Sequence, residues 1–323
     1  MKNINIYLIP KWEVAQKFCS CFDATIEAEY GDNVLKGNTL TLAHHIKEFK
    51  NCPAPCNNFQ ANSEVFLPLN DNVLNVGISH IDLDTIGGLA ALLGYKYSFQ
   101  SDFWSVAEFI DVNGPHHIHK FPQKIQDLLN AYYGWSSENR FTPTNEDIID
   151  VTETVYQHFE ILDNIFQLNG ENDLIKKGRE WATNIQETIE KLLIEENKDY
   201  RVFITNGVFC NASYYSPALK TIAKVIVVLN KKFNAITISC SDNSINCCQI
   251  VQSLWGNEAG GREGIAGSPR GKQMTEQDLQ NVINYIATIF NYKILGCNRC
   301  QYTWRAKDDL CCPICGNPPT HEN

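Results

Sequence analysis

Positive charge is scarce in this chain of 323 residues, because 27 lysines and arginines face 37 aspartates and glutamates and give a formal net charge of -10. Proteins that bind duplex nucleic acid usually present a basic face, so we expect no such partner. A small nucleotide or a short single-stranded oligonucleotide, held through a metal ion, is compatible with this charge balance.

Long apolar runs are missing at the N-terminus. The stretch from Ile4 to Pro10 is too brief for the apolar core of a signal peptide and far too brief to span a bilayer. We therefore expect a soluble, cytoplasmic protein with no membrane partner. Without a secretion signal, most of the thirteen cysteines are expected to be reduced thiols. A homodimer is compatible with the sequence.

Four cysteines near the C-terminus have the spacing of a zinc ribbon. They form two Cys-x-x-Cys pairs around a short aromatic-containing hairpin: Cys297, Cys300, Cys312 and Cys315. Four thiolates complete the coordination of zinc, so this Zn²⁺ is expected to be structural and to supply the folding free energy of the ribbon. The neighbouring Tyr302, Trp304, Arg305 and Lys307 could contact nucleic acid or protein, or pack against the parent domain.

The strongest candidate for a catalytic metal site follows the apolar run from Val73 to Ile78. The chain there continues as His80-x-Asp82-x-Asp84 and then as a small-residue helix from Thr85 to Leu93. If the motif is extended, its three polar side chains share one face. One imidazole and two carboxylates without a nearby Lys or Arg favour a divalent cation over a salt bridge. The alternative is a strand end at which an acid such as Asp84 caps the helix.

A second set of candidate ligands follows the apolar segment from Val106 to Asp111. We interpret this acid as the end of a strand, followed by a turn and the pair His116 and His117. The alternative is that these histidines cover a loop surface. Two further contributions remain open: Asp150 could be a ligand or could stabilise the first turns of a helix expected over 145–168, and His44 with His45 could join the site.

The predicted secondary structure changes at Tyr200, from long helices to short strands. Before it we expect helices over 121–135 and 173–196, and after it strands over 201–204, 223–230 and 235–240 and helices over 247–255 and 275–290, the last opened by a capping box at Thr275. We therefore place a metal-binding domain at 1–170, a connector helix at 171–199, a substrate-binding domain at 200–292 and the ribbon at 293–323.

Two loops of the second domain are candidates for substrate binding. One carries Asn211 and Ser213 in a polar and aromatic stretch. The other is rich in glycine, includes Gly260, Gly261, Arg262 and Arg270, and lacks the spacing of a nucleoside-triphosphate P-loop. Glycine-rich backbone can approach an anion closely, and the two arginines could add bidentate contacts to phosphate. A plain flexible loop is the alternative.

Together these motifs resemble the DHH phosphoesterase superfamily. His80-x-Asp82-x-Asp84 looks like its first metal-binding motif, Asp111 with His116 and His117 looks like its Asp-His-His motif, and Gly260 to Gly267 looks like the glycine-rich segment of its associated substrate-binding domain. The resemblance implies an α/β fold with a parallel-sheet catalytic domain and a smaller mixed α/β domain. In this chain Val112 to Pro115 separate the Asp from the His pair, and the ribbon is an addition to the common core.

The resemblance also implies an activity. We expect a Mn²⁺- or Mg²⁺-dependent phosphohydrolase acting on a short oligonucleotide, a cyclic dinucleotide or a nucleotide phosphoester. His80, Asp82, Asp84, Asp111 and Asp150 would supply metal ligands. His116 and His117, with Asp111, would orient the phosphate or protonate the leaving oxygen, and the arginine and glycine segment would hold the distal phosphate. The alternative is a catalytically degenerate nucleotide-binding or nucleic-acid-tethered sensing module.

Overall fold

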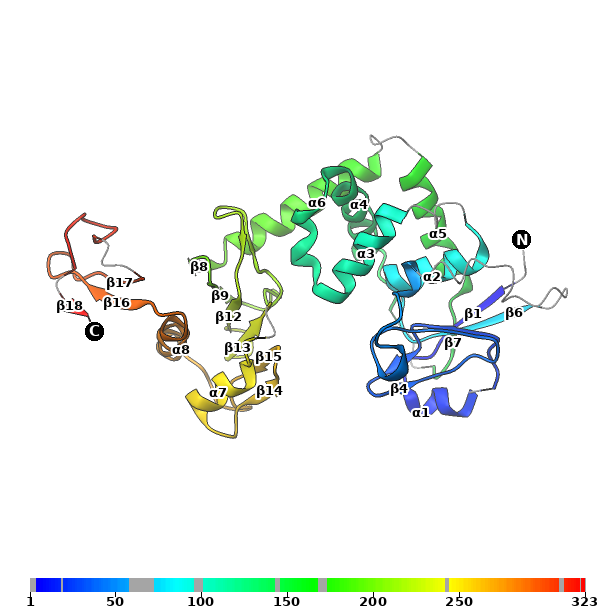
Figure 1. The fold of residues 1–323 in the computed structure, drawn as a ribbon, viewed down its shortest axis with the longest axis horizontal. Helices are drawn as coiled ribbons and strands as arrows, with labels where there is room; N and C mark the ends of the chain where they lie inside the picture. The colour runs from blue at the N-terminus through cyan, green and yellow to red at the C-terminus, as the bar shows by residue number, and fades with distance from the viewer. Residues whose placement is uncertain are drawn as a thin grey trace. The chain divides into compact units, whose positions relative to one another are not determined.

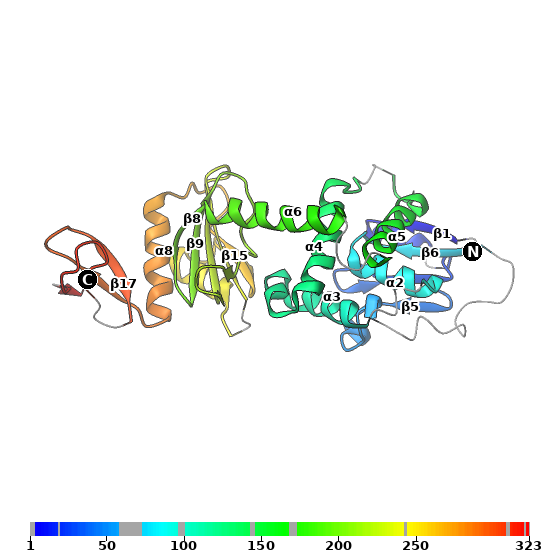
Figure 2. The same cartoon turned by 90° about the horizontal axis from the view of Figure 1, so that it is seen from above.

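The computed structural model describes residues 4–18, 20–57, 73–95, 101–142, 146–167, 173–241, 244–307, 311–319 and 321–322. The chain divides into two compact units, residues 1–185 and 186–323. Both units are mixed α/β, as Figures 1 and 2 show. Within the described part, none of the helices combines the length and the apolar character that crossing a bilayer requires.

A five-stranded sheet forms the centre of the first unit. Its strand order is β5 (Leu40–Leu42), β2 (Ala24–Ile26), β6 (Leu74–Ile78), β1 (Ile4–Leu8) and β7 (Ile149–Asp150). The first four strands are parallel neighbours, and β7 runs antiparallel to β1. Side chains alternate along β1, so Ile4, Ile6 and Leu8 are buried on one face while Tyr7 packs with a separate cluster on the other.

Helices cover the larger core of this unit. They are α2 (Leu83–Leu93), α3 (Ser101–Asn113), α4 (Gln123–Glu138), α5 (Thr152–Gln167) and the first part of α6 (Asp173–Glu190). The smaller face packs on α1 (Trp12–Ala15), near the hairpin of β3 (Glu29–Tyr30) and β4 (Asn33–Val34). Short 3-10 turns complete the unit: η1 (Gln16–Phe18), η2 (Lys47–Phe49), η3 (Pro55–Asn57) and η7 (Pro115–Lys120).

The glycines of α2 allow a close approach that helps to position the site. A side chain at Gly87 would collide with Cys56, and one at Gly88 would meet Pro55. Because neither glycine has a side chain, η3 lies directly on this helix. The helix is capped at its start by Asp82, whose side chain accepts from the backbone N–H of Thr85, and it ends at Gly94 in the left-handed conformation.

A six-stranded sheet forms the second unit. Its order is β14 (Gly260–Arg262), β15 (Ile265–Gly267), β13 (Ala235–Cys240), β12 (Val225–Asn230), β9 (Tyr200–Thr205) and β8 (Leu193–Glu196), with β9 and β12 parallel and the other neighbours antiparallel. The helices α7 (Cys247–Trp255) and α8 (Glu276–Ile289) pack on one face. Small sheets pair β10 (Tyr215–Ser216) with β11 (Thr221–Ile222), and β16 (Lys293–Gly296) with β17 (Thr303–Ala306) and β18 (His321–Glu322).

One predicted element is wrong in kind and two predicted helices differ in their bounds. Val106 to Asp111 belongs to α3, because its buried residues continue a helical spacing from Phe103 through Val106 and Ala107 to Ile110. The helix expected over 145–168 begins only at Thr152, since Ile149–Asp150 pairs with β1. The predicted helix 173–196 ends at Glu190, and its polar end forms β8.

Two further expectations about loops and strand ends are also wrong. The glycine-rich loop is a β-hairpin over Gly260–Gly267, in which Gly261 has a φ of 157° and packs against Ala266. The His80-x-Asp82-x-Asp84 motif does not continue a strand, because β6 ends at Ile78 and α2 starts at Leu83, although Asp82 itself keeps an extended backbone. The strands β9, β12 and β13 and the helices α7 and α8 confirm the predicted elements, including the capping box between Thr275 and Asp278.

Candidate metal centre

Three adjacent parallel strands end at one edge of the first sheet. Ile26 of β2 lies opposite Leu42 of β5 and Ile78 of β6, so the residues that follow these strands emerge at the same level. Glu27 follows β2 directly, and His44 with His45 follows β5 after a single alanine. Ligands in α/β proteins bind outside the carboxyl ends of parallel strands, and this edge is such a place.

Imidazole and carboxylate groups meet there. His44 Nε2 lies 3.7 Å from Glu27 Oε1 and 3.3 Å from Oδ2 of both Asp84 and Asp111. His45 Nε2 lies 3.7 Å from Glu27 Oε2 and 3.4 Å from Asp111 Oδ2. Two overlapping sets therefore form, Glu27 with His44 and His45, and His44 with Asp84 and Asp111, and within each set the ligand atoms lie within 4.8 Å of one another.

Helices deliver the two aspartates to this group. Asp84 lies in the first turn of α2, where the backbone N–H of Cys56 donates to its Oδ1 at 2.8 Å. This contact leaves Oδ2 of Asp84 directed at His44. Asp111 comes from the last turns of α3 and lies at the surface. Asp84 and Asp111 thus lie among the candidate ligand atoms, their role as metal ligands stays a prediction, and the elements that carry them differ from those predicted.

Three atoms of this group are buried without a well-aligned hydrogen bond among the residues that the structure describes, although His44 Nε2 lies within 3.7 Å of the other two: Glu27 Oε1, His44 Nε2 and Asp84 Oδ2. A buried polar atom without a partner costs roughly 1–3 kcal/mol, and more when it is charged. Three such atoms converging on one place indicate a missing positive ligand. Carboxylate oxygens and imidazole nitrogens are suitable ligands for Mn²⁺, Mg²⁺ or Zn²⁺, so the group fits a divalent cation.

The electrostatics agree with this interpretation. Burial, reinforced by the charge of Asp84, raises the pKa of Glu27 to about 10. Burial alone would lower the pKa of His44, but its contacts with Asp111 and Asp84 and the charge of Glu27 outweigh that effect and raise the pKa to about 10. The group therefore holds an excess of negative charge that attracts protons or metal cations.

Two backbone features fix the ligands. Glu27 has a φ of 49°, in the left-handed region that non-glycine residues rarely adopt, and its carbonyl accepts a hydrogen bond from the Ser79 hydroxyl. The side chain of Glu29 accepts from the backbone N–H groups of both His44 and His45, at 3.1 and 3.2 Å. Such strain is found where the surrounding structure determines a functional conformation.

His80 and Asp82 lie outside the two sets. His80 Nε2 is 3.0 Å from Asp82 Oδ2, and His80 Nδ1 is 2.8 Å from the Ser79 hydroxyl. Desolvation by burial would lower the pKa of His80, but the contact with Asp82 outweighs this effect and raises the pKa. The two side chains thus bind each other, while Asp82 caps α2. Their role as metal ligands stays a prediction.

The other predicted residues of the first unit are placed elsewhere. His116 and His117 lie in η7, and burial lowers the pKa of both, in His116 to about 4. Asp150 is exposed in β7, where its side chain accepts from the backbone N–H of Thr152 and caps α5. Among the described residues, none of the three belongs to a group of ligand atoms.

The predicted substrate residues of the second unit come from two segments of the chain. Asn211 and Ser213 contribute backbone carbonyls, which accept from the Ser239 hydroxyl and from Arg201 at 2.7 Å each. Gly260, Gly261 and Arg262 form the exposed strand β14, and Arg270 is exposed after the hairpin. Anion binding by these arginines stays a prediction.

The cysteines of the tail come together as expected for a zinc site. The Sγ atoms of Cys297 and Cys315, and those of Cys300 and Cys312, are 3.5 Å apart, and all four lie within 4.8 Å of one another. Four thiols so arranged could hold Zn²⁺. The other described cysteines are free thiols.

The ribbon packs on its parent unit. Arg305 contacts Glu195 Oε2 at 2.7 Å and Asn284 Oδ1 at 2.6 Å, and Lys307 contacts Asp199 Oδ2 at 2.8 Å. For Arg305 and Lys307, packing against the parent domain is therefore the alternative observed, whereas Tyr302 is exposed and Trp304 packs in the core of the ribbon itself.

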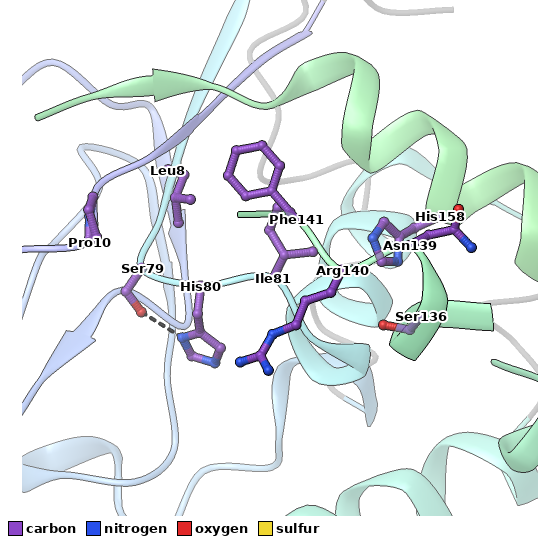
Figure 3. A pocket seen from close by; sticks show the side chains of 10 residues that line it. All are labelled: Leu8, Pro10, Ser79, His80, Ile81, Ser136, Asn139, Arg140, Phe141 and His158. Atoms are coloured by element: carbon purple, nitrogen blue, oxygen red, sulfur yellow. Dashed lines mark hydrogen bonds between the residues drawn. The ribbon is translucent and has the colours of Figure 1, made fainter. Parts of the chain in front are cut away.

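A pocket of about 220 Å³ opens at the same carboxyl edge of the sheet, beside the ends of β1 and β6, and Figure 3 shows its lining. Ser79 and His80, which follow β6, form part of its wall together with residues that follow β1 and α4. Ser79 also binds the Glu27 carbonyl, so one segment of chain contributes to the pocket and supports the ligand group.

Glu27 is the residue that the sequence did not reveal. It stands alone between Ile26 and Ala28, without a motif. Only its position after a strand resembles that of His44, and a single acid after a strand is too common to indicate a ligand.

Comparisons with known proteins establish no family. No family model and no curated protein matches the chain. Among solved structures, a pGpG-specific phosphodiesterase, PggH, from Vibrio cholerae is 15% identical over 69% of this chain and 81% of its own, with a TM-score of 0.39. An uncharacterised protein from Helicobacter pylori G27 is 11% identical over 62% and 57%, with a TM-score of 0.23. Such scores do not establish a common fold, and we base the function on the side chains.

Proposed function

We propose that this protein is a divalent-metal-dependent phosphohydrolase that cleaves a phosphoester of a nucleotide, a cyclic dinucleotide or a short oligonucleotide. The observation that carries the proposal is the convergence of Glu27, His44, His45, Asp84 and Asp111 at the carboxyl edge of the sheet, with three buried atoms unpartnered. Glu27, His44 and Asp84 are buried without a Lys or Arg partner, and such groups serve metal chemistry more readily than stability.

The charges and positions of these residues suggest how a phosphoester would be bound and hydrolysed. The carboxylates of Asp84 and Asp111 would repel a phosphate, so bound cations would be needed to attract the substrate to this edge. Bound there, Mn²⁺ or Mg²⁺ would supply a hydroxide-like nucleophile near neutral pH and would neutralise charge on phosphorus. Glu29 holds the backbone of His44 and His45, and Cys56 fixes one oxygen of Asp84, so the ligands are oriented before any cation arrives.

Other predicted residues keep proposed roles. His80 and Asp82 would join the metal only if their mutual contact opened. His116 or His117 would orient the phosphate or protonate the leaving oxygen, and the exposed Arg262 and Arg270 would hold a distal phosphate. Each of these roles needs a separate test, because the convergence at His44 does not depend on them.

The first experiment measures Mn²⁺ binding by calorimetry and product release from oligonucleotides, cyclic dinucleotides and nucleotide phosphoesters. Wild type is compared with Asp84→Asn and with Asp102→Asn, an exposed acid in the first turn of α3. We expect Asp84→Asn to lower the Mn²⁺ affinity and the rate by about 100-fold or more, since even residues that only support ligands cost 10–100-fold. Asp102→Asn should behave like wild type.

Two results would contradict the proposal. If metal binds only at the four cysteines, the group around His44 is not a metal centre and the proposal fails. Nucleotide binding without cleavage, under every divalent cation tried, would favour the sensing module.

A further inference from the structure

The pocket at the carboxyl edge of the first sheet has a size that restricts its ligand. Pockets for drug-sized ligands measure roughly 300–1,000 Å³, so about 220 Å³ suits one compact group such as a single ring system. It lies outside the carboxyl ends of β1 and β6, the position expected for a ligand site in a parallel sheet.

Part of its lining is apolar. Leu8 and Pro10 come from the end of β1, Ile81 from the segment before α2, and Phe141 from the segment after α4 (Figure 3). Apolar and aromatic walls favour the flat face of a ring over a hydrated phosphate or sugar.

Apart from Arg140 and His80, the polar part of the lining offers hydrogen bonds without charge. His158 is buried, its Nδ1 lies 2.9 Å from the Tyr132 hydroxyl, and burial lowers its pKa to about 4, so the ring is neutral near pH 7. Ser136 and Asn139 add neutral groups. A phosphate site normally gathers several cations or backbone N–H groups, and these side chains do not provide them.

Arg140 is the one lining side chain with a permanent positive charge. In Figure 3 its guanidinium extends towards the His80 ring, across the pocket from Leu8 and Pro10. The planar guanidinium fork can bind the acceptor edge of a heterocycle bidentately or stack on its face.

We propose that this pocket binds the nucleobase of the substrate, with Phe141 and Ile81 against the ring and Arg140 at its edge. The inference rests on the proposed function for the identity of the substrate. Because Ser79 supports Glu27 and lines the pocket, a nucleotide whose base lies here has its phosphate near the ligand group. If the first unit recognises the base, the preference of the enzyme among nucleobases does not depend on Arg262 and Arg270.

The test measures binding of adenosine, guanosine, cytidine and uridine, with ribose 5-phosphate as the probe that lacks a base. Calorimetry is performed without added divalent cation, so that the result does not depend on catalysis. The variants are Arg140→Ala, Phe141→Ala and Ser136→Trp, which fills the pocket. The controls are Phe141→Tyr, which keeps an aromatic face, and Lys124→Ala, an exposed cation of α4. Thermal melts identify any variant that fails to fold.

We expect at least one nucleoside to bind wild type, Phe141→Tyr and Lys124→Ala equally, and to bind the other three variants about tenfold or more weakly. Ribose 5-phosphate should not compete. The proposal is overturned if no nucleoside binds, if the pocket variants bind as well as wild type, or if ribose 5-phosphate binds as tightly and is lost in Arg140→Ala, which would indicate a phosphate site.

The same variants separate this inference from the proposed function. Variant-sensitive nucleoside binding without any hydrolysis would reject the hydrolase and retain the base pocket. Hydrolysis that treats base-bearing and abasic phosphoesters alike, in wild type and in Arg140→Ala, would retain the hydrolase and reject the pocket.

Discussion

Glu29 accepts hydrogen bonds from two successive backbone N–H groups, those of His44 and His45. Its own side chain belongs to neither of the two sets of candidate ligands. It orients the His pair without belonging to the metal ligands. This relationship separates the group that would bind the metal from the group that prepares it.

The first prediction concerns this positioning. Glu29→Ala removes both acceptor contacts and should weaken Mn²⁺ binding about 10–100-fold, as loss of a supporting residue does in other metal sites. Glu29→Gln keeps a carbonyl oxygen and should retain most of the affinity. Calorimetry on the two variants checks the prediction, and equal losses in both would show that the negative charge of Glu29 matters more than its hydrogen bonds.

The second prediction concerns strain at Glu27. Glycine accepts a φ of 49° freely, and Glu27→Gly also removes a buried acid next to Asp84. We expect relief of strain to raise the free energy of unfolding of the metal-free variant by about 1–3 kcal/mol, so that it melts at a higher temperature. Added Mn²⁺ should not stabilise this variant further. Lys220→Gly is the matched control, because Lys220 is exposed in the second unit with a φ of 53°. It should gain stability and keep the response to Mn²⁺.

The third prediction concerns the ribbon. Cys300→Ser removes one of the four converging thiols and should abolish stoichiometric zinc binding and expose the ribbon to protease. Cys311→Ser, at an exposed neighbouring cysteine, should change neither property. We would measure zinc content by atomic absorption and protease sensitivity by limited proteolysis. Together these measurements distinguish a ribbon that folds only with metal from a hairpin that is stable without metal.

The fourth prediction is a pH dependence of ribbon docking. Burial raises the pKa of Asp199, but its contacts with Lys307, Tyr292 and Lys224 outweigh burial and hold that pKa below its usual range. The contribution to stability is therefore complete above the unfolded-state pKa of about 4 and is lost as the pH falls through the lower folded-state pKa.

Hydrogen exchange in the ribbon should accordingly stay constant from pH 7 to about pH 5, after correction for intrinsic rates, and show lower protection below about pH 4. Asp199→Asn should lower protection already at pH 7 and flatten the acid dependence. Glu258→Gln, at an exposed acid of the same unit, is the control. An unchanged acid dependence in Asp199→Asn would assign the transition to other groups.

Local signals sufficed wherever neighbouring residues in the chain carry the structure. Thr275 and Asp278 lie three positions apart and form their capping box within one helical turn. Each Cys-x-x-Cys pair forms a tight turn, and the short segment between the two turns brings their thiols together. The continuous apolar run of β12 and the alternating apolar residues of β13 likewise indicate which of their residues are buried. By contrast, a short apolar window before Asp111 could not distinguish a helix from a strand.

The sequence by itself therefore determined the ribbon, most elements of the second unit and the presence of acids and histidines suited to a metal. Only the tertiary structure decided which of them meet. Glu27, His44, Asp84 and Asp111 lie on four separate segments, and they converge because β5, β2 and β6 are adjacent parallel strands while α2 and α3 turn their acids towards the same edge. Strand order arises from packing between distant segments, which no local pattern records.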